Sequence, residues 1–212
     1  MKKQQLNSSI ICFSIILFLI IADQLLKIWI KTNFAIGDEI RITDFFYLHF
    51  IENEGMAFGM SFFDKKYLTI FRIIASIAIG YYIYFSIKNK SERIYIISLS
   101  LIFAGAFGNI IDSLLYGQVF TDSTPYSIAE WVPFGEGYAP VFYGKVVDMF
   151  YFPLINGTYW SWLPIVGGSP FTFFAPVFNI ADAAISVGVF IIILHELTMN
   201  AQAKTKKNLS QE

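Results

Sequence analysis

The stretch IYIISLSLIFAGAFGNIIDSLLY, residues 94–116, decides the fold class of this chain. A helix needs about 20 predominantly apolar residues to cross the hydrocarbon core of a bilayer, and this stretch is long enough. Its single charged side chain, Asp112, lies near the end of the run. Ionisable groups are costly inside a membrane and usually have a function there. The stretch therefore predicts a transmembrane helix that carries a functional carboxylate.

Three further runs share this length and apolar character. They cover about residues 10–30, 67–87 and 177–197. In the whole chain 56% of the residues are hydrophobic and 15% are charged, whereas a soluble domain has roughly 25% charged residues. The sequence therefore predicts an all-α membrane protein with four transmembrane helices, in which residues 1–212 form a single integral membrane domain.

The basic residues predict how the chain is oriented in the membrane. Lys and Arg accumulate in short cytoplasmic flanks, and here they gather at both termini and between the second and third helices. These residues are Lys2, Lys3, Lys88, Lys90, Arg93, Lys204, Lys206 and Lys207. With four spans these places share one side, so we expect both termini in the cytoplasm and two long outer segments, at about residues 31–66 and 117–176.

The two outer segments differ in character. Asp44–Ile51 is aromatic and rich in strand-favouring residues, and the turn sequence Asn53-Glu54-Gly55 follows it. The second segment holds all 7 prolines of the chain, with many aromatic residues between them. We therefore expect a small extracytoplasmic β-sheet and long surface loops, with Trp and Tyr at the level of the lipid headgroups.

Polar side chains share one face of the third helix and one face of the fourth. Residues three or four apart lie on the same side of a helix. The two faces carry Gly105, Gly108, Asn109 and Asp112 in the third helix and Asn179, Asp182 and Ser186 in the fourth. Lipid offers no partner to an Asn or Asp, so we expect the two faces to meet near the outer membrane surface, either as a reactive site or as a structural clamp.

The first helix ends with a second candidate pair, Asp23 and Lys27. These residues are four apart, so they share a helix face and can pair. The residues alone leave two interpretations open. The pair either anchors the outer end of the helix or faces a substrate.

The residue types exclude several kinds of catalysis. His49 and His195 are expected on opposite sides of the membrane, so no histidine-based triad is indicated, and the metalloprotease pattern H-E-x-x-H is absent. A Ser–Lys pair built on Lys27 or Lys145 would need a nearby Ser, and none is close in sequence. We therefore expect no metal and no cofactor.

Carboxylates remain as the candidate catalytic groups, namely Asp112, Asp148 and Asp182. Two neighbouring carboxyl groups cannot easily both ionise, so they can share one proton. The ionised member activates water and the protonated member donates to the peptide carbonyl. Spacing alone does not choose which two of the three Asp form the pair.

Five ordered motifs resemble lipoprotein signal peptidase, the signal peptidase II family of aspartic peptidases. They extend over nearly the whole chain, and their order makes the resemblance specific. The motifs are Asp23-Gln-Leu-Leu-Lys27, Asn53-Glu-Gly55-Met-Ala57-Phe-Gly59, Gly105-Ala-Phe-Gly108-Asn109-Ile-Ile-Asp112, Val147-Asp148-Met-Phe150 and Phe178-Asn179-Ile-Ala181-Asp182.

The resemblance implies an intramembrane endopeptidase of the bacterial inner membrane, with Asp148 and Asp182 as the catalytic dyad. The implied substrate is a diacylglyceryl-modified prolipoprotein, cut before its lipidated cysteine, and the implied inhibitor is of the globomycin type. Membrane lipid is the other implied partner. No nucleic acid is expected as a partner, because the sequence has no basic patch with interleaved aromatic residues. A substrate-binding or supporting role is implied for Asp23, Lys27, Asn53, Gly55, Gly108, Asn109, Asp112, Asn179 and Ala181.

Two departures from the family pattern stand out. The family usually has Arg after the Asp of the third helix, and this chain has Ser113. Asp112 and Asp148 are 36 positions apart and Asp148 and Asp182 are 34 apart, and both spacings are longer than is usual for the family.

Two other classes compete with a peptidase. A small transporter or channel would continue its polar path to the inner side, but residues 94–103 and 187–194 are mostly apolar. A structural membrane subunit would not need two aspartates so placed. The one-sided distribution of polar groups favours an enzyme.

Overall fold

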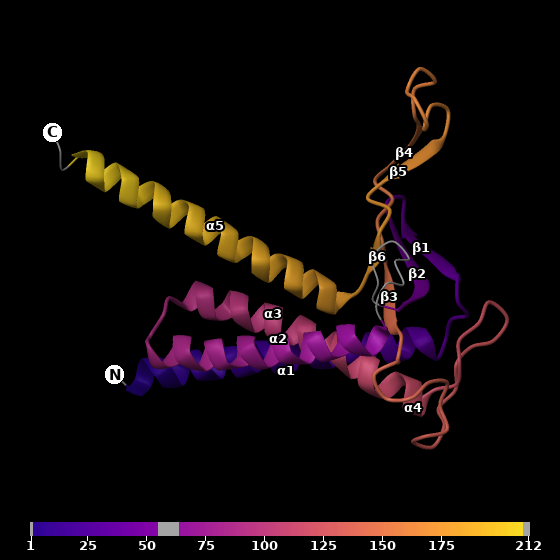
Figure 1. The fold of residues 1–212 in the computed structure, drawn as a ribbon, viewed down its shortest axis with the longest axis horizontal. Helices are drawn as coiled ribbons and strands as arrows, with labels where there is room; N and C mark the ends of the chain where they lie inside the picture. Colours follow the sequence, from indigo (N-terminus) through magenta and orange to yellow (C-terminus); the bar gives the residue numbers. More distant parts are fainter. Residues whose placement is uncertain (1, 55–63, 210–212) are drawn as a thin grey trace. The chain divides into compact units, whose positions relative to one another are not determined.

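Four long helices dominate the structure. The computed structural model describes residues 2–54 and 64–209. Within that part of the chain the long helices are α1 (Lys2–Lys31), α2 (Lys65–Lys88), α3 (Arg93–Ile111) and α5 (Ile180–Leu209) (Figure 1). Four helical stretches of the described residues are long and apolar enough to cross a membrane, which confirms the four predicted spans.

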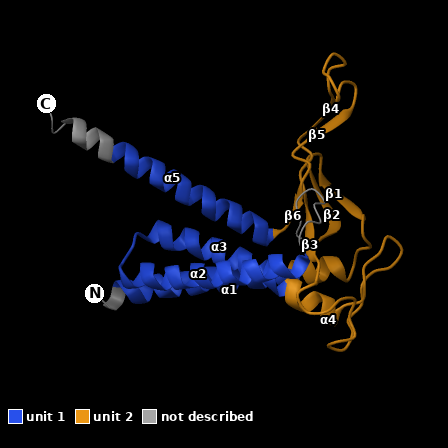
Figure 2. Ribbon diagram, viewed as in Figure 1, with its two compact units in different colours: residues 1–25, 62–111, 180–212 blue, residues 26–61, 112–179 orange. Residues whose placement is uncertain are grey.

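The chain divides into two compact units (Figure 2). The first comprises residues 1–25, 62–111 and 180–212, and it contains most of the helical residues. Its buried core joins Cys12 to Ile83, Ile96 and Leu99. Cys12 thus behaves as a small hydrophobic residue, as expected for a lone cysteine in an apolar helix.

Small residues let α3 and α5 pack closely in this first unit. A Cβ atom at Gly105 would lie 2.2 Å from the carbonyl oxygen of Ala181, and one at Gly188 would lie 2.7 Å from that of Ser98. Only glycine fits at such distances, because the two backbones nearly touch. This close approach brings the polar faces of the two helices together.

The second unit, residues 26–61 and 112–179, contains two β-sheets. Four antiparallel strands form the larger sheet in the order β1-β2-β3-β6. They are β1 (Glu39–Thr43), β2 (Phe46–Asn53), β3 (Val146–Tyr151) and β6 (Val177–Phe178). A separate hairpin consists of β4 (Ile155–Thr158) and β5 (Pro170–Phe173). The small predicted sheet is confirmed, and Asp44–Ile51 corresponds largely to β2.

A change of helix type follows α3. The chain continues as a π-helical turn, Asp112–Tyr116, and then as the short helix α4, Gly117–Val119. π-helical turns are frequent at functional sites. Gly144 packs on this turn, since a Cβ atom there would lie 2.1 Å from the carbonyl oxygen of Asp112.

The predicted element boundaries need two corrections. The last helix begins at Ile180 rather than near residue 177, because Val177 and Phe178 pair with β3 as strand β6. The third span is α-helical only to Ile111, and its last turn is the π-helical one. The prediction that residues 1–212 form one domain stays a prediction.

Candidate active site

Asp148 is a buried carboxylate held by two side-chain amides. It lies on β3, and only 1% of its surface is exposed. Asn179 Nδ2 donates to Asp148 Oδ1 at 2.7 Å, and Asn53 Nδ2 donates to Oδ2 at 3.2 Å. A buried charge is costly unless it is hydrogen-bonded. The two amides meet this need by donating to both oxygens of the carboxylate.

The sheet explains why these three residues meet. Asp148 lies opposite Ile51 in the pairing of β2 with β3, and Asn53 follows two residues later on the same face. Asn179 comes directly after β6, which pairs with β3 on its other side. Its Nδ2 also donates to the carbonyl oxygen of Val147 at 3.2 Å. The site is therefore built from three neighbouring strands.

Asp112 forms a second buried polar group in the same unit. Its Oδ2 lies 2.8 Å from Lys27 Nζ, and both side chains have 0% exposure. The same oxygen accepts a hydrogen bond from the backbone N–H of Val147 at 3.3 Å. Asp112 thus supports the residue that precedes Asp148.

Asp182 has its own partner in the first unit. It lies in the first turn of α5, and Asn109 Nδ2 on α3 donates to its Oδ1 at 2.8 Å. The contact confirms the expected meeting of the two polar faces for Asn109 and Asp182, whereas Asp112 and Asn179 bond to residues of the second unit.

Asp23 provides a hydrogen-bond acceptor for the backbone at the beginning of α5. Its Oδ1 accepts a hydrogen bond from the backbone N–H of Ala181 at 2.9 Å, and Asp23 is 2% exposed. The first N–H groups of a helix have no partner within the helix. Gly108 leaves room for this contact, because a Cβ atom there would lie 2.8 Å from Asp23 Oδ2 and 3.3 Å from the Cβ atom of Ala181.

The expected site residues therefore form two groups, one in each compact unit. The first unit holds Asp23, Gly108, Asn109, Ala181 and Asp182, and the second holds Lys27, Asn53, Asp112, Asp148 and Asn179. Gly55 lies outside the described residues. The pairing of Asp148 with Asp182 stays a prediction, since the two residues belong to different units.

Sequence reasoning missed a further buried ion pair in the second unit. Lys31, at the end of α1, pairs with Glu52 on β2, and the side chains are 0% and 2% exposed. The sequence could have indicated Lys31, because it lies four residues after Lys27 and therefore on the same helix face. Among residues 2–54 and 64–209, no group of three or more His, Cys, Asp or Glu side chains could hold a metal ion.

Two solved structures define the class of protein to which this architecture belongs. Each is described as a bacterial membrane enzyme determined by the in meso method, at 2.3 Å and 1.9 Å resolution. The first has a TM-score of 0.60 at 26% identity and covers 90% of both chains. The second has a TM-score of 0.58 at 27% identity, covering 88% of this chain and 92% of that one. The chain therefore has the fold of a bacterial membrane enzyme.

Sequence comparison gives the family. The family model described as signal peptidase (SPase) II matches residues 15–198. A lipoprotein signal peptidase of Porphyromonas gingivalis is 43% identical, over 93% of this chain and 88% of that protein. One of Amoebophilus asiaticus is 38% identical, over 86% of this chain and 75% of that protein. This chain belongs to the signal peptidase II family and is a peptidase of the bacterial inner membrane, which disfavours the transporter or channel.

Proposed function

We propose that this chain removes signal peptides from diacylglyceryl-modified prolipoproteins by aspartic catalysis, cutting before the lipidated cysteine. The observation that carries the catalytic part is Asp148, a buried carboxylate with amide donors on both of its oxygens. Asp182 is the second member of the proposed dyad, since it lies in the first turn of α5 within the matching family motif and has Asn109 as its own donor.

The proposed reaction needs only the two carboxyl groups and one water. Asp148 is the ionised member, because two N–H donors stabilise its negative charge. It takes a proton from the water, whose oxygen attacks the scissile carbonyl carbon. Asp182 donates its proton to the carbonyl oxygen, which gives a tetrahedral diol. As the C–N bond breaks, the departing amine takes up the proton held by Asp148, and one hydroxyl of the diol returns a proton to Asp182. The products are a free carboxyl group and a free amino group, and no cofactor takes part.

The β4–β5 hairpin supports lipid as a partner. The 33 residues between Asp148 and Asp182 include no charged side chain. Trp160, Trp162 and Ile165 are 70%, 72% and 103% exposed. Trp is typical of the boundary between membrane and water. We infer that this hairpin contacts the outer boundary of the bilayer, on the side where a lipid-anchored substrate and a globomycin-type inhibitor would bind.

The test is cleavage of a lipidated precursor by purified protein in detergent or vesicles. Asp148→Asn and Asp182→Asn should each lower turnover by about 10²–10⁴-fold, because each removes a proton-transferring group. Asp44→Asn is the matched control, since Asp44 is 89% exposed and pairs with the exposed Arg41 in the same unit as Asp148. Globomycin should inhibit the wild-type protein. Wild-type turnover by either dyad variant would remove the aspartic mechanism.

A further inference from the structure

A second buried charge cluster lies behind the strand that carries Asn53. Successive side chains of a strand point to opposite faces, so Glu52 faces away from Asp148 while Asn53 faces towards it. On its own face Glu52 pairs with Lys31 through Oε1. Two adjacent residues of β2 thus connect the candidate catalytic carboxylate on one side to a buried ion pair on the other.

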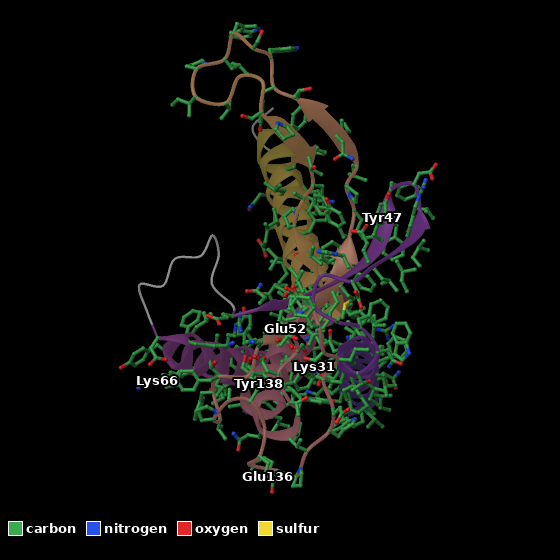
Figure 3. All side chains as sticks on the ribbon, turned by 90° about the vertical axis from the view of Figure 1, so that its right-hand side faces the viewer. Lys31, Tyr47, Glu52, Lys66, Glu136 and Tyr138 are labelled. Atoms are coloured by element: carbon green, nitrogen blue, oxygen red, sulfur yellow. The ribbon has the colours of Figure 1, made fainter. Side chains whose placement is uncertain are left out.

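The cluster continues into the segment that joins α4 to β3. Ser123 Oγ accepts from Lys31 Nζ at 2.9 Å and donates to Glu52 Oε1 at 3.1 Å. Lys145 Nζ lies 3.4 Å from Glu52 Oε2 and 2.8 Å from Asp122 Oδ1. The two lysines and the two carboxylates balance to a net charge of zero. Figure 3 shows Lys31 and Glu52 next to each other.

Tyr138 completes the cluster. The ammonium groups of Lys31 and Lys145 lie 4.9 Å and 5.2 Å from the centre of its ring, which is within the range of cation–π attraction. Its hydroxyl oxygen accepts a hydrogen bond from the backbone N–H of Lys145 at 2.6 Å. Burial, together with the nearby charge of Glu52, raises the pKa of Tyr138, so the phenol stays neutral.

The contacts tie both ends of residues 120–145 to the sheet. Asp122 and Ser123 come from the start of this segment, whereas Tyr138 and Lys145 come from its end. Lys145 directly precedes β3, the strand of Asp148. Segment 120–145 lies within one of the two chain stretches that are longer than is usual for the family. Its polar anchors therefore hold the edge of the candidate active site.

Stability alone does not account for such a cluster. Removing charges from water costs more than a buried ion pair usually returns, and apolar side chains of similar size often stabilise a protein better. The advantage of an ion pair is geometric, because its atoms accept few alternative arrangements. A register shift of one residue in β2 would exchange Glu52 and Asn53 between the two faces.

We propose that Glu52, held by Lys31 and Lys145, is a positioning residue that fixes β2 so that the amide of Asn53 reaches Asp148. This inference rests on the proposed catalytic role of Asp148. It also gives a function to segment 120–145, which supplies Ser123 and Lys145 and so becomes part of the active-site framework.

The test is a double-mutant cycle read in steady-state kinetics. Glu52→Gln should lower kcat roughly tenfold and leave KM within about twofold, because a misplaced catalytic group slows the reaction more than it weakens binding. Asn53→Ala should do the same. The double variant should be no slower than the slower single variant, since Glu52 acts through Asn53. Multiplying effects would show that Glu52 acts independently of Asn53 and would overturn the inference.

Lys145→Met provides a second route in case Glu52→Gln fails to fold. Lys145 is 24% exposed, so its loss is easier to tolerate, and it should show the same lack of additivity with Asn53→Ala. Arg41→Met is the matched control, because it removes an exposed positive charge on β1 of the same sheet, where Arg41 pairs with Asp44 in the turn after β1. Wild-type kcat in Lys145→Met, or an equal loss in Arg41→Met, would contradict the proposal. Asp148→Asn distinguishes failure of the proposed dyad from failure of the proposed positioning role. Wild-type turnover in Asp148→Asn would contradict the dyad. An inactive Asp148→Asn together with normal Glu52 variants would contradict the positioning role alone.

Discussion

At the residue scale, the buried pair of Lys27 and Asp112 supports the strand that carries Asp148. Asp112 Oδ2 receives both the ammonium group of Lys27 and the backbone N–H of Val147. The residues alone left Asp112 open as a member of the catalytic pair. Its contacts favour a supporting role, because its oxygen is engaged in holding the strand of Asp148.

Lys27→Met should destabilise the protein strongly. Removing one partner leaves the other charge buried and uncompensated, which costs about 3–5 kcal/mol. The midpoint of thermal unfolding in detergent should fall accordingly. In Lys27→Met/Asp112→Asn the second substitution removes the buried negative charge that has lost Lys27, and the Asn oxygen can still accept from the backbone N–H of Val147. The double variant should therefore be more stable than Lys27→Met alone, and an equally unstable double variant would contradict this account.

At the element scale, the contact between α3 and α5 depends on glycine. Gly105 faces the carbonyl oxygen of Ala181, and a Cβ atom would also lie 2.7 Å from Ile185 Cγ1. The same helix pair carries the hydrogen bond from Asn109 to Asp182. Any added volume at Gly105 would therefore separate the helices and lengthen that bond.

Gly105→Ala should lower stability by about 1–3 kcal/mol, the usual cost of overpacking, and should also reduce peptide cleavage. Gly80→Ala is the matched control on α2. Its Cβ atom would meet only the ring of Phe103, at 3.2 Å, and alanine favours the helix over glycine. Unfolding midpoints in detergent and turnover measured side by side would check this. Equal behaviour of the two variants would mean that the α3–α5 contact tolerates separation.

The elements also show how far sequence reasoning reaches. Apolar runs of about 20 residues identify membrane helices because lipid forces every backbone polar group to be satisfied within the helix. The aromatic run of β2 was equally visible. Strand β6 was not, since Val177 and Phe178 merge into the apolar start of α5. A two-residue strand depends on its neighbour β3, and such a contact leaves no local pattern.

In the candidate site too, local sequence patterns indicated some residues, whereas others are brought together only by the tertiary structure. The motifs pointed to Asp148, Asn53 and Asn179. The spacing of polar residues predicted that a face of the third helix, which includes Asn109, meets a face of the fourth, which includes Asp182. Glu52 was missed, because it precedes Asn53 as an unremarkable polar residue of a strand. Its partners Lys31 and Lys145 are 21 and 93 positions away. Pairings over such distances are set by tertiary structure.

At the scale of the whole molecule, the chain alternates between its two compact units. Each unit takes residues from separate stretches of sequence, and each holds one of the two proposed catalytic aspartates. The membrane orientation expected from the basic residues assigns 31–66 and 117–176 to the outer side. The aromatic β4–β5 hairpin belongs to the second of these segments, which agrees with a position at the outer lipid boundary.

This orientation can be tested by cysteine labelling. Cys12 is the only cysteine and is buried, so Cys12→Ser gives a background without reactive thiols. Tyr126→Cys, at a residue that is 98% exposed in segment 120–145, should react in intact spheroplasts with a maleimide that cannot cross the membrane. Ser91→Cys, between α2 and α3, should react only after permeabilisation. Cleavage activity of each variant serves as the control for correct insertion.

The reverse labelling pattern would reverse the topology and move segment 120–145, with its contacts to Glu52, to the cytoplasmic side. A lipoprotein precursor whose cleavage site is at the outer surface could not then reach Asp148, so this measurement tests the orientation and the proposed substrate together.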